Sequence, residues 1–497
     1  MQDFIRINDN DNVAVALKPI AKGTSLDVCG NAVTTVEDIP QGHKFAIKPV
    51  AKGEEVVKYG FRIGYAQEDV ETGAWIHTHN LKTALGELLE YTYNPTGVDV
   101  KPTEEAFFEG YMRENGKVGV RNEVWIVPTV GCVNSIARAI ETAARAKKPE
   151  GVDEVVAFTH PYGCSQMSDD QENTRTILAD LINHPNAGAV LVLGLGCENS
   201  NIGVLKEYIG EVNPDRVKFL SVQDVEDEQE VAGKMLDELM AYAAAFKREK
   251  VSAKELIIGM KCGGSDGLSG ITANPIVGAF SDMLVSKGGT TILTEVPEMF
   301  GAETLLMDRC VDEKIFDKTV KLINNFKEYF QKNGQTIYEN PSPGNKKGGI
   351  STLEDKSLGC TQKSGSALVK GVLEYGERVE TKGLNLLSAP GNDLVASTAC
   401  AAAGAQIVLF TTGRGTPFAS PVPTVKIATN SLMADRKSNW IDFNAGRMVE
   451  DMSKEDLAKE LFQLVLDVAS GKKVKAEEEG FHDFAIFKQG VTLLSLI

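Results

Sequence analysis

Six of the eight cysteines stand beside a glycine. We take Cys29 as a small apolar residue, and four of the other five follow a short apolar run that is typical of a strand. The clearest example is T-H-P-Y-G-C-S-Q, residues 159–166, which follows the apolar run Val155–Phe158. Thiolates and imidazoles select iron or zinc over magnesium. We therefore expect two or three of these thiols, together with an imidazole, to hold a metal. The five are Cys132, Cys164, Cys197, Cys262 and Cys360, and Cys132, Cys164 and Cys262 are the metal ligands that we predict.

The histidines supply further candidate ligands. His77 and His79 close the stretch G-A-W-I-H-T-H, and alternation along a strand would place both imidazoles on one face, where they could share a metal. A hydrogen-bonded pair of surface histidines explains the same pattern equally well. His160 is either a ligand or a proton shuttle, or else a histidine that bonds to its own turn.

The glycine-rich stretch 263–275 predicts a ligand-binding loop. Glycines allow a backbone to approach a ligand closely, and hydroxyl, carboxyl and amide side chains supply hydrogen bonds. An irregular loop that needs positive φ angles is the alternative. The side chains that we expect to bind substrate in this loop are Ser265, Asp266, Thr272 and Asn274.

Four basic residues lie near the same predicted strand ends, and each could bind a carboxylate. A solvated surface position explains any one of them equally simply. Glu295 and Glu298 follow another strand-like run and could act as acid or base, or cap a helix. The four basic residues are Arg175, Lys261, Lys363 and Arg414.

The elements that must position these residues change character along the chain. Residues 16–23, A-L-K-P-I-A-K-G, return as A-I-K-P-V-A-K-G at residues 46–53, which predicts a small all-β domain with internal pseudo-symmetry over residues 1–91. A polar linker follows at 92–106, and then strand and helix patterns alternate, which implies α/β domains with mainly parallel sheets at 107–250 and 251–497. Strands are expected near 123–130, 153–159, 188–194, 217–222, 255–260, 289–295, 384–388 and 405–411.

Composition limits the classes of partner. The chain has 497 residues and a net charge of −17, which argues against nucleic acid or an anionic membrane as the main partner, because both need a basic surface. We find no apolar run long enough to span a bilayer and no signal peptide, so we expect a cytoplasmic protein with reduced cysteines. An exposed edge of the small β domain could support a homo-oligomer.

Taken together, the motifs resemble those of the altronate/galactarate dehydratase family along nearly the whole chain. The N-terminal repeat is similar to the β-clip domains of antifreeze-like proteins. The matching stretches are H-T-H-N at 77–80, T-V-G-C-V-N at 129–134, Y-G-C-S-Q at 162–166, G-L-G-C-E-N at 194–199, C-G-G-S-D-G-L-S-G at 262–270, T-E-V-P-E at 294–298, G-C-T-Q-K at 359–363 and S-A-P-G-N-D at 388–393.

This resemblance implies a sugar-acid dehydratase that depends on Fe²⁺, or on Mn²⁺. The implied reaction is D-altronate to 2-keto-3-deoxy-D-gluconate and water. Removing the weakly acidic proton beside a carboxylate needs a bound cation and fixed donors that stabilise an enediolate. His160 and Tyr162 are our leading candidates for moving protons, with Lys261 or Lys363 as carboxylate clamp or base.

Three alternatives remain open at this stage. The substrate could be galactarate or another aldonate or aldarate. The iron could belong to an iron–sulfur cluster on three of the glycine-adjacent cysteines. The chain could also bind a sugar acid without turning it over.

Overall fold

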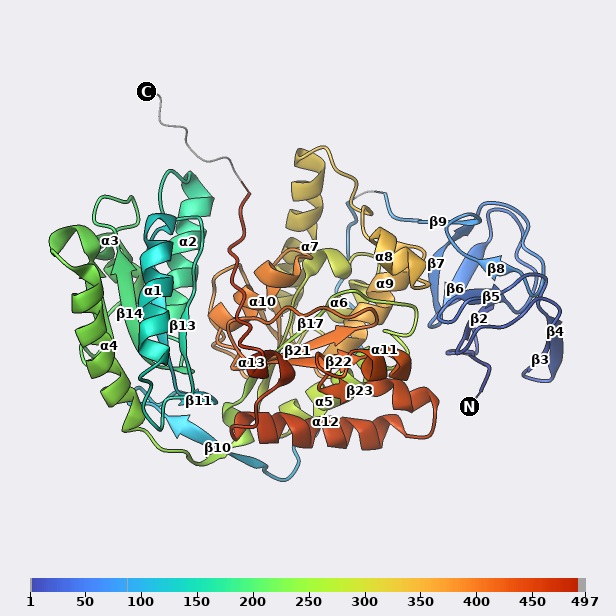
Figure 1. Cartoon of the computed structure of the whole chain (residues 1–497). Helices are drawn as coiled ribbons and strands as arrows, with labels where there is room; N and C mark the ends of the chain where they lie inside the picture. The colour runs from blue at the N-terminus through green and yellow to red at the C-terminus, as the bar shows by residue number, and fades with distance from the viewer. Residues whose placement is uncertain (1, 87, 490–497) are drawn as a thin grey trace.

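The structure is a computed structural model, and it describes residues 2–86 and 88–489. Three domains lie in a row, with the C-terminal domain in the middle and the N-terminal domain and the first α/β domain on either side (Figure 1). Among the described residues, no helix has both the length and the apolar character needed to cross a bilayer.

The N-terminal domain is built from short antiparallel strands, which confirms the predicted small β domain. Both copies of the sequence repeat leave a strand and enter an isolated bridge, Ile20 with Ile39 in the first copy and Val50 with Val70 in the second. The four-stranded sheet is β1 (Phe4–Ile5), β2 (Val13–Ala16), β5 (Lys44–Ala46) and β8 (Trp75–Ile76); the smaller sheets hold β3 (Ser25–Val28) with β4 (Asn31–Thr34), and β6 (Glu55–Lys58), β7 (Phe61–Ala66) and β9 (Leu81–Lys82).

The first α/β domain has a parallel four-stranded sheet in the order β13-β12-β14-β15. Its strands are fully apolar at their centres because helices cover both faces. Helices α1 and α4 pack on one face and α2 and α3 on the other. The strands are β12 (Glu123–Pro128), β13 (Val155–Ala157), β14 (Ala187–Gly194) and β15 (Val217–Ser221), and the helices are α1 (Asn134–Arg145), α2 (Ser168–Ile182), α3 (Ile202–Ile209) and α4 (Glu228–Ala244).

The C-terminal domain has a parallel seven-stranded sheet in the order β19-β20-β18-β17-β21-β22-β23. Its strands are β17 (Ile257–Cys262), β18 (Thr290–Leu293), β19 (Val369–Leu373), β20 (Gly383–Leu387), β21 (Ile407–Thr412), β22 (Thr424–Ala428) and β23 (Phe443–Asn444). Its helices are α5 (Ala273–Ser286), α6 (Thr304–Met307), α7 (Glu313–Lys332), α8 (Pro343–Lys347), α9 (Leu353–Cys360), α10 (Asp393–Ala402), α11 (Ser431–Arg436), α12 (Lys454–Ala469) and α13 (Lys475–Glu478).

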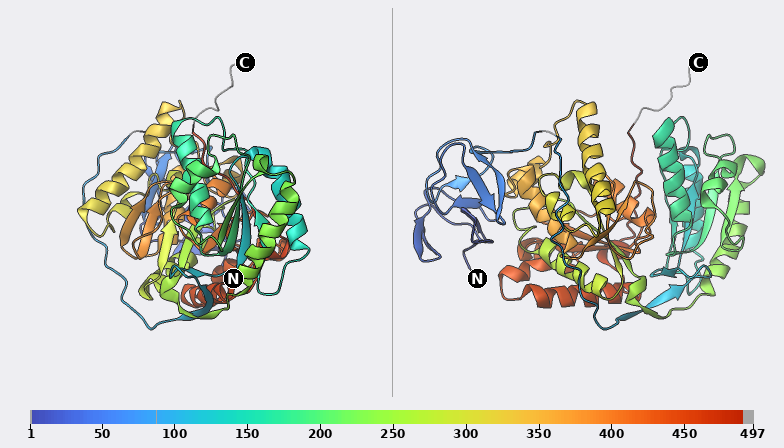
Figure 2. Two further views of the ribbon diagram at one scale, coloured as in Figure 1. Left: turned by 90° about the vertical axis from the view of Figure 1, so that its left-hand side faces the viewer. Right: turned by 180° about the vertical axis from the view of Figure 1, so that it is seen from behind.

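Two adjacent strands join the first α/β domain to the C-terminal domain. β10 (Phe107–Met112) enters the domain and pairs antiparallel with β16 (Glu249–Ser252), which leaves it, and β11 (Val118–Gly119) adds to the other edge of β10. The C-terminal segment returns between the two α/β domains (Figures 1 and 2), where the ring of Phe484 lies 5.9 Å from that of Phe158.

All eight strands expected from the sequence are present, and the fold class is confirmed. One local expectation is wrong: His77 and His79 lie in a turn after β8, so strand alternation does not place them on one face. Cys360, unlike the other four cysteines of its set, ends a helix, α9. The expected domain bounds stay a prediction.

Candidate active site

A cavity of about 680 Å³ opens at the carboxyl ends of the central strands of the C-terminal sheet. Ligand sites of parallel sheets form at this edge because the loops that leave the strands meet there. Cys262 ends β17, Glu298 follows β18, and residues 391–394 follow β20. Residues 339–346 form the opposite wall. The fold thus brings residues that lie far apart in the sequence to one hollow.

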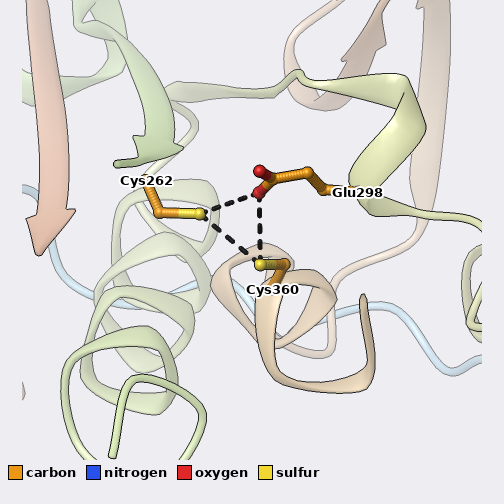
Figure 3. Close-up of side chains that lie close together, drawn as sticks. All are labelled: Cys262, Glu298 and Cys360. Carbon is orange, nitrogen blue, oxygen red and sulfur yellow. Dashed lines mark hydrogen bonds between the residues drawn. The ribbon is translucent and has the colours of Figure 1, made fainter. Parts of the chain in front are cut away.

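Two thiols and a carboxylate meet beside this cavity (Figure 3): Cys262 and Glu298 line it, and Cys360 lines a small adjoining one. The Sγ atoms of Cys262 and Cys360 lie 3.4 Å apart, and Glu298 Oε2 lies 3.0 Å from the first and 3.3 Å from the second. All three residues are buried. The hydrogen bond between the thiols lowers the pKa of Cys262 and raises that of Cys360. We call these three residues the Cys–Glu–Cys triad.

Two buried lysines balance the charge of the triad. Lys363 Nζ donates to Cys262 Sγ at 3.2 Å, and Lys356 Nζ lies 2.6 Å from Glu298 Oε1. Burial alone would lower the pKa of Lys363, but the neighbouring thiols and carboxylates outweigh burial and raise it. In return, both ammonium groups lower the pKa of Glu298, against the effect of burial. The two lysines therefore favour the charged forms of Glu298 and Cys262.

A second ionic chain runs behind the cavity wall. Lys261 Nζ, which is fully buried, lies 3.0 Å from Glu295 Oε1 and 2.5 Å from Asp393 Oδ1. The side chain of Asp393 is 35% exposed and lines the cavity. Glu295 has φ +67°, a left-handed conformation that is strained for a residue with a side chain. That turn places Glu295 Oε2 2.9 Å from the backbone N of Cys262.

One glycine permits the close packing at the cavity. A Cβ on Gly263 would lie 2.5 Å from the ring of Phe410 and 2.6 Å from a carboxylate oxygen of Asp393. Glycine at this position is therefore explained by the approach of Asp393 to the loop after β17.

The polar residues predicted in the 263–275 loop mostly bond to the protein itself. The Thr272 hydroxyl donates to Leu268 O. The side-chain amide of Asn274 donates to Gly359 O and accepts from the Thr411 hydroxyl. Asp266 accepts hydrogen bonds from the Ser269 and Thr429 hydroxyls. These contacts hold the loop against α9. Substrate binding by Thr272, Asn274 and Asp266 stays a prediction.

Ser265 differs from its neighbours in the loop. Its hydroxyl is buried and has no hydrogen-bond partner among the described residues. It lies with Lys356 and Cys360 on the wall of a small adjoining cavity. A buried hydroxyl without a partner is costly unless a ligand or a water satisfies it. Ser265 is therefore the predicted substrate-binding residue that the contacts of this region favour most.

The two predicted arginines lie in different domains. Arg414 is exposed, and its backbone N donates to Gly264 O at 3.1 Å, so it lies beside the loop that lines the cavity. Arg175 lies on α2 of the first α/β domain, where it contacts Glu172 and Ser200. The structure does not bring Arg175 to the cavity.

The predicted proton-moving pair also lies in the first α/β domain. His160 Nε2 lies 2.8 Å from Pro128 O, and Tyr162 N donates to its Nδ1 at 3.2 Å, so both ring nitrogens are engaged within neighbouring turns. Burial lowers the pKa of His160 to about 4. Tyr162 directs its hydroxyl toward Ile486 O at 3.4 Å. These contacts match the interpretation of His160 as a histidine that bonds to its own turn.

The predicted metal ligands are divided among three domains. Cys262 belongs to the triad, whereas Cys132 and Cys164 are exposed on the first α/β domain. His77 and His79 lie on the N-terminal domain, where their rings lie 5.4 and 5.3 Å from that of Trp75. Among the described residues, only the triad brings three potential ligand atoms within 4.8 Å of one another.

Sequence reasoning left Glu298, Cys360, Lys356, Asp393 and Lys346 out of the predicted site. Glu298 was considered as an acid or base, and Cys360 as a metal ligand. They lie next to each other because η4 (Val296–Glu298) and α9 pack together, which the sequence does not show. Lys356 lies inside α9 and carried no signal, because a lysine in a helix usually faces water.

The triad has donors that suit a metal ion. Two thiols and a carboxylate are a ligand set for iron or zinc, and their donor atoms lie within reach of one ion. Lys356 and Lys363 already contact these donors, so an ion would share the site with two ammonium groups. The buried hydroxyl of Ser265 adds an unused oxygen nearby. The residues present therefore fit an iron(II) ion.

Three family models together match nearly the whole chain. They are the altronate/galactarate dehydratase SAF domain at residues 2–84, the D-galactarate dehydratase/altronate hydrolase second domain at 110–244, and the D-galactarate/altronate dehydratase C-terminal domain at 253–492.

Similar curated proteins cover the same span. The chain is 55% identical to an altronate dehydratase of Bacillus subtilis and 53% identical to one of Escherichia coli, in each case over 99% of this chain and 100% of the relative. It is 34% identical to the galactarate dehydratase (L-threo-forming) of E. coli, over 97% of this chain and 96% of the relative. The chain therefore belongs to the altronate/galactarate dehydratase family.

Proposed function

We propose that this chain is a hydro-lyase that dehydrates D-altronate to 2-keto-3-deoxy-D-gluconate and water. One observation carries the proposal: two altronate dehydratases match it at 53–55% identity over their entire length. The reaction removes the proton at C2, beside the carboxylate, and expels the hydroxyl at C3. The enol that results tautomerises to the 2-keto acid.

We assign the reaction to the 680 Å³ cavity, with Fe²⁺ as the preferred metal and Mn²⁺ as an alternative. Cys262, Glu298 and Cys360 are the residues that would hold the ion. When bound, it supplies a Lewis acid that stabilises the negative charge developing beside the carboxylate. Lys363 keeps Cys262 in its thiolate form, which is the form that binds metals.

The remaining cavity residues supply binding and proton transfer. Lys356 Nζ is held by Asn340 Oδ1 at 3.0 Å as well as by Glu298, so a fixed ammonium group faces the hollow. Lys346 lines the same cavity. These two cations suit the carboxylate of a sugar acid. Asp393, oriented by Lys261, is the carboxylate that we assign to accept the C2 proton.

An anaerobic assay of the iron-loaded protein tests this proposal. We expect D-altronate to yield a 2-keto-3-deoxy acid, a chelator to stop the reaction, and galactarate to react more slowly. Turnover of galactarate alone would keep the reaction and change the substrate. Absence of turnover with every sugar acid, in folded and iron-loaded protein, would exclude the dehydratase and leave a binding protein.

A variant series tests the assignment of Asp393. Asp393→Asn should lower kcat by about 10²- to 10⁴-fold, because general-base catalysis contributes that much. Asp435→Asn, at an exposed position of α11, is the matched control and should leave kcat unchanged. An unchanged kcat in Asp393→Asn would assign the base elsewhere.

The cellular setting is part of the proposal. We place the reaction in the cytoplasm, where thiols such as those of Cys262 and Cys360 stay reduced. Their Sγ atoms are close enough that an oxidising compartment would favour their linkage.

A further inference from the structure

Three thiols outside the candidate active site gather at the carboxyl edge of the other parallel sheet. Cys132 follows β12, Cys164 follows β13 and Cys197 follows β14, and these three strands are neighbours in the order β13-β12-β14. Neighbouring strands lie about 4.8 Å apart. All three cysteines are exposed and free. The topology therefore presents three accessible thiols on one edge.

The loops that carry these cysteines are bonded to one another. Gly131 N donates to Tyr162 O at 2.9 Å, which joins the Cys132 loop to the Cys164 loop. Asn199 Oδ1 accepts from Ser165 N at 3.0 Å and from the thiol of Cys164 at 3.2 Å, which joins the Cys164 loop to the Cys197 loop. The Cys164 loop thus bridges the other two.

The glycines beside these cysteines permit this contact. A Cβ on Gly163 would lie 2.0 Å from Thr129 O, and a Cβ on Gly131 would lie 2.9 Å from His160 O. Gly163 also has φ +102°, which disfavours other residues. The repeated Gly-Cys pairs of the sequence are explained here by loops that approach closely while they display thiols.

The surroundings of the three thiols favour a negatively charged group. Helices α1, α2 and α3 begin shortly after Cys132, Cys164 and Cys197, so their N-terminal ends face the same edge of the sheet. Helix N-termini and the backbone N–H groups of such turns stabilise anions, iron–sulfur clusters among them. The guanidinium of Arg175 also lies near this edge, with Nη2 3.3 Å from Asn199 O, and its charge is paired with Glu172 at 2.8 Å.

The spacing of the thiols argues against one ion held by all three. Thiolates on one ion must lie within about 4 Å of each other, given a metal–sulfur bond of about 2.3 Å. Among the described residues, the Cys–Glu–Cys triad meets a 4.8 Å limit and these three thiols do not. A group containing several metal ions holds its thiolates farther apart.

We propose that Cys132, Cys164 and Cys197 hold an iron–sulfur cluster. In a four-iron cluster bound by four cysteines, each iron has a ligand from the protein. With only three cysteines, one iron has no protein ligand and is open to an oxygen of water or of a sugar acid. The proposal does not depend on the assigned reaction, because the cluster is measured without substrate.

The test is metal and sulfide analysis of full-length protein expressed and purified without oxygen. We expect a brown protein with about four acid-labile sulfides and about five irons per chain, about four in the cluster and about one at the triad, and a paramagnetic resonance signal after reduction. Cys132→Ser, Cys164→Ser and Cys197→Ser should each lose the sulfide and the visible absorbance. Cys29→Ser is the matched control, because Cys29 is also free and exposed but lies on the N-terminal domain.

Two outcomes would overturn the proposal. One is iron without sulfide that disappears in Cys262→Ser and persists in the three variants, which would place a single ion at the triad. The other is cluster absorbance that survives in all three variants. Circular dichroism of each variant distinguishes loss of the cluster from loss of the fold.

Discussion

Three acidic side chains at the cavity each contact a lysine. Glu298 contacts Lys356, Cys262 contacts Lys363, and Asp393 contacts Lys261. Buried charges persist only when they are paired, because removing one partner leaves the other without water and without a counter-charge. Each pair can therefore be tested by removing one member.

Lys356→Met should destabilise the C-terminal domain by about 3 kcal/mol, because it leaves the buried carboxylate of Glu298 without its nearest counter-charge. The free energy of unfolding in urea measures this loss. The double variant Glu298→Gln, Lys356→Met removes both charges and should recover most of it. Lys347→Met, at an exposed position of α8, is the matched control and should leave the free energy of unfolding unchanged. A loss below about 1 kcal/mol would show that Lys363 alone stabilises Glu298.

Two buried histidines give the first α/β domain a pH-dependent stability. Burial lowers the pKa of His160 to about 4 and that of His184 to about 3, whereas an unfolded histidine titrates near 6.5. Between pH 6.5 and 4 the unfolded state therefore binds more protons. The stabilisation is fully present above pH 6.5 and is lost as the pH falls through this window.

At pH 5 each of these histidines should lower the free energy of unfolding by about 2 kcal/mol relative to pH 7. Urea unfolding followed by the fluorescence of Trp125, which stacks on His184 at 5.4 Å, measures this in a Trp75→Phe, Trp440→Phe background. His184→Gln should remove about half of the pH dependence, because His160 remains, and the exposed His79→Gln should remove none. An equal slope in His184→Gln would show that His184 does not contribute to it.

At the scale of elements, helix α9 links the N-terminal domain to the cavity. Asp355 on α9 accepts from Lys44 Nζ at 2.8 Å and from Lys58 Nζ at 3.0 Å, and all three side chains are buried. The next residue is Lys356, and α9 ends at Cys360. The N-terminal domain therefore fixes the helix that supplies two cavity residues.

Asp355→Asn should loosen α9 and lower kcat by about 100-fold, because a displacement of about 1 Å at a reacting group can cost that much. Hydrogen exchange of residues 353–360 measures the loosening directly. Asp69→Asn, at an exposed turn of the N-terminal domain, is the matched control. Full protection of α9 in Asp355→Asn would show that packing alone positions the helix.

Much of the element order was predictable, because buried strands such as Val155–Ala157 and Ala187–Gly194 are continuous apolar runs. β16 (Glu249–Ser252) was not predicted, because two of its four residues are exposed and it lies in a lysine-rich segment of the chain. The candidate site was predictable only in part. Cys262 lies at a strand end, where sequence indicates a site. Its partner Cys360, and the Lys356 that pairs with Glu298, come from helix α9, and sequence alone does not show where that helix packs.

At the scale of the whole molecule, the chain covers the C-terminal domain from both sides. Between the N-terminal domain and β10, residues 88–106 contain no helix or strand, yet the hydroxyl of Tyr93 donates to Cys310 O at 3.1 Å. The linker is therefore bound to the surface of the C-terminal domain. A homo-oligomer through the open edge of the N-terminal domain stays a prediction. Light scattering after size exclusion tests it, and a mass of 53.7 kDa would exclude it.

The pairing of β10 with β16 has a consequence for how this chain could be rebuilt. Gly110 lies opposite Glu249, so the polypeptide enters and leaves the first α/β domain at a single point. A short turn between these two strands could replace everything between them. The shortened chain would keep the Cys–Glu–Cys triad, but it would expose the apolar cluster in which Leu387 and Ala399 of the C-terminal domain pack with Leu178 of the first α/β domain, so that face would need polar substitutions.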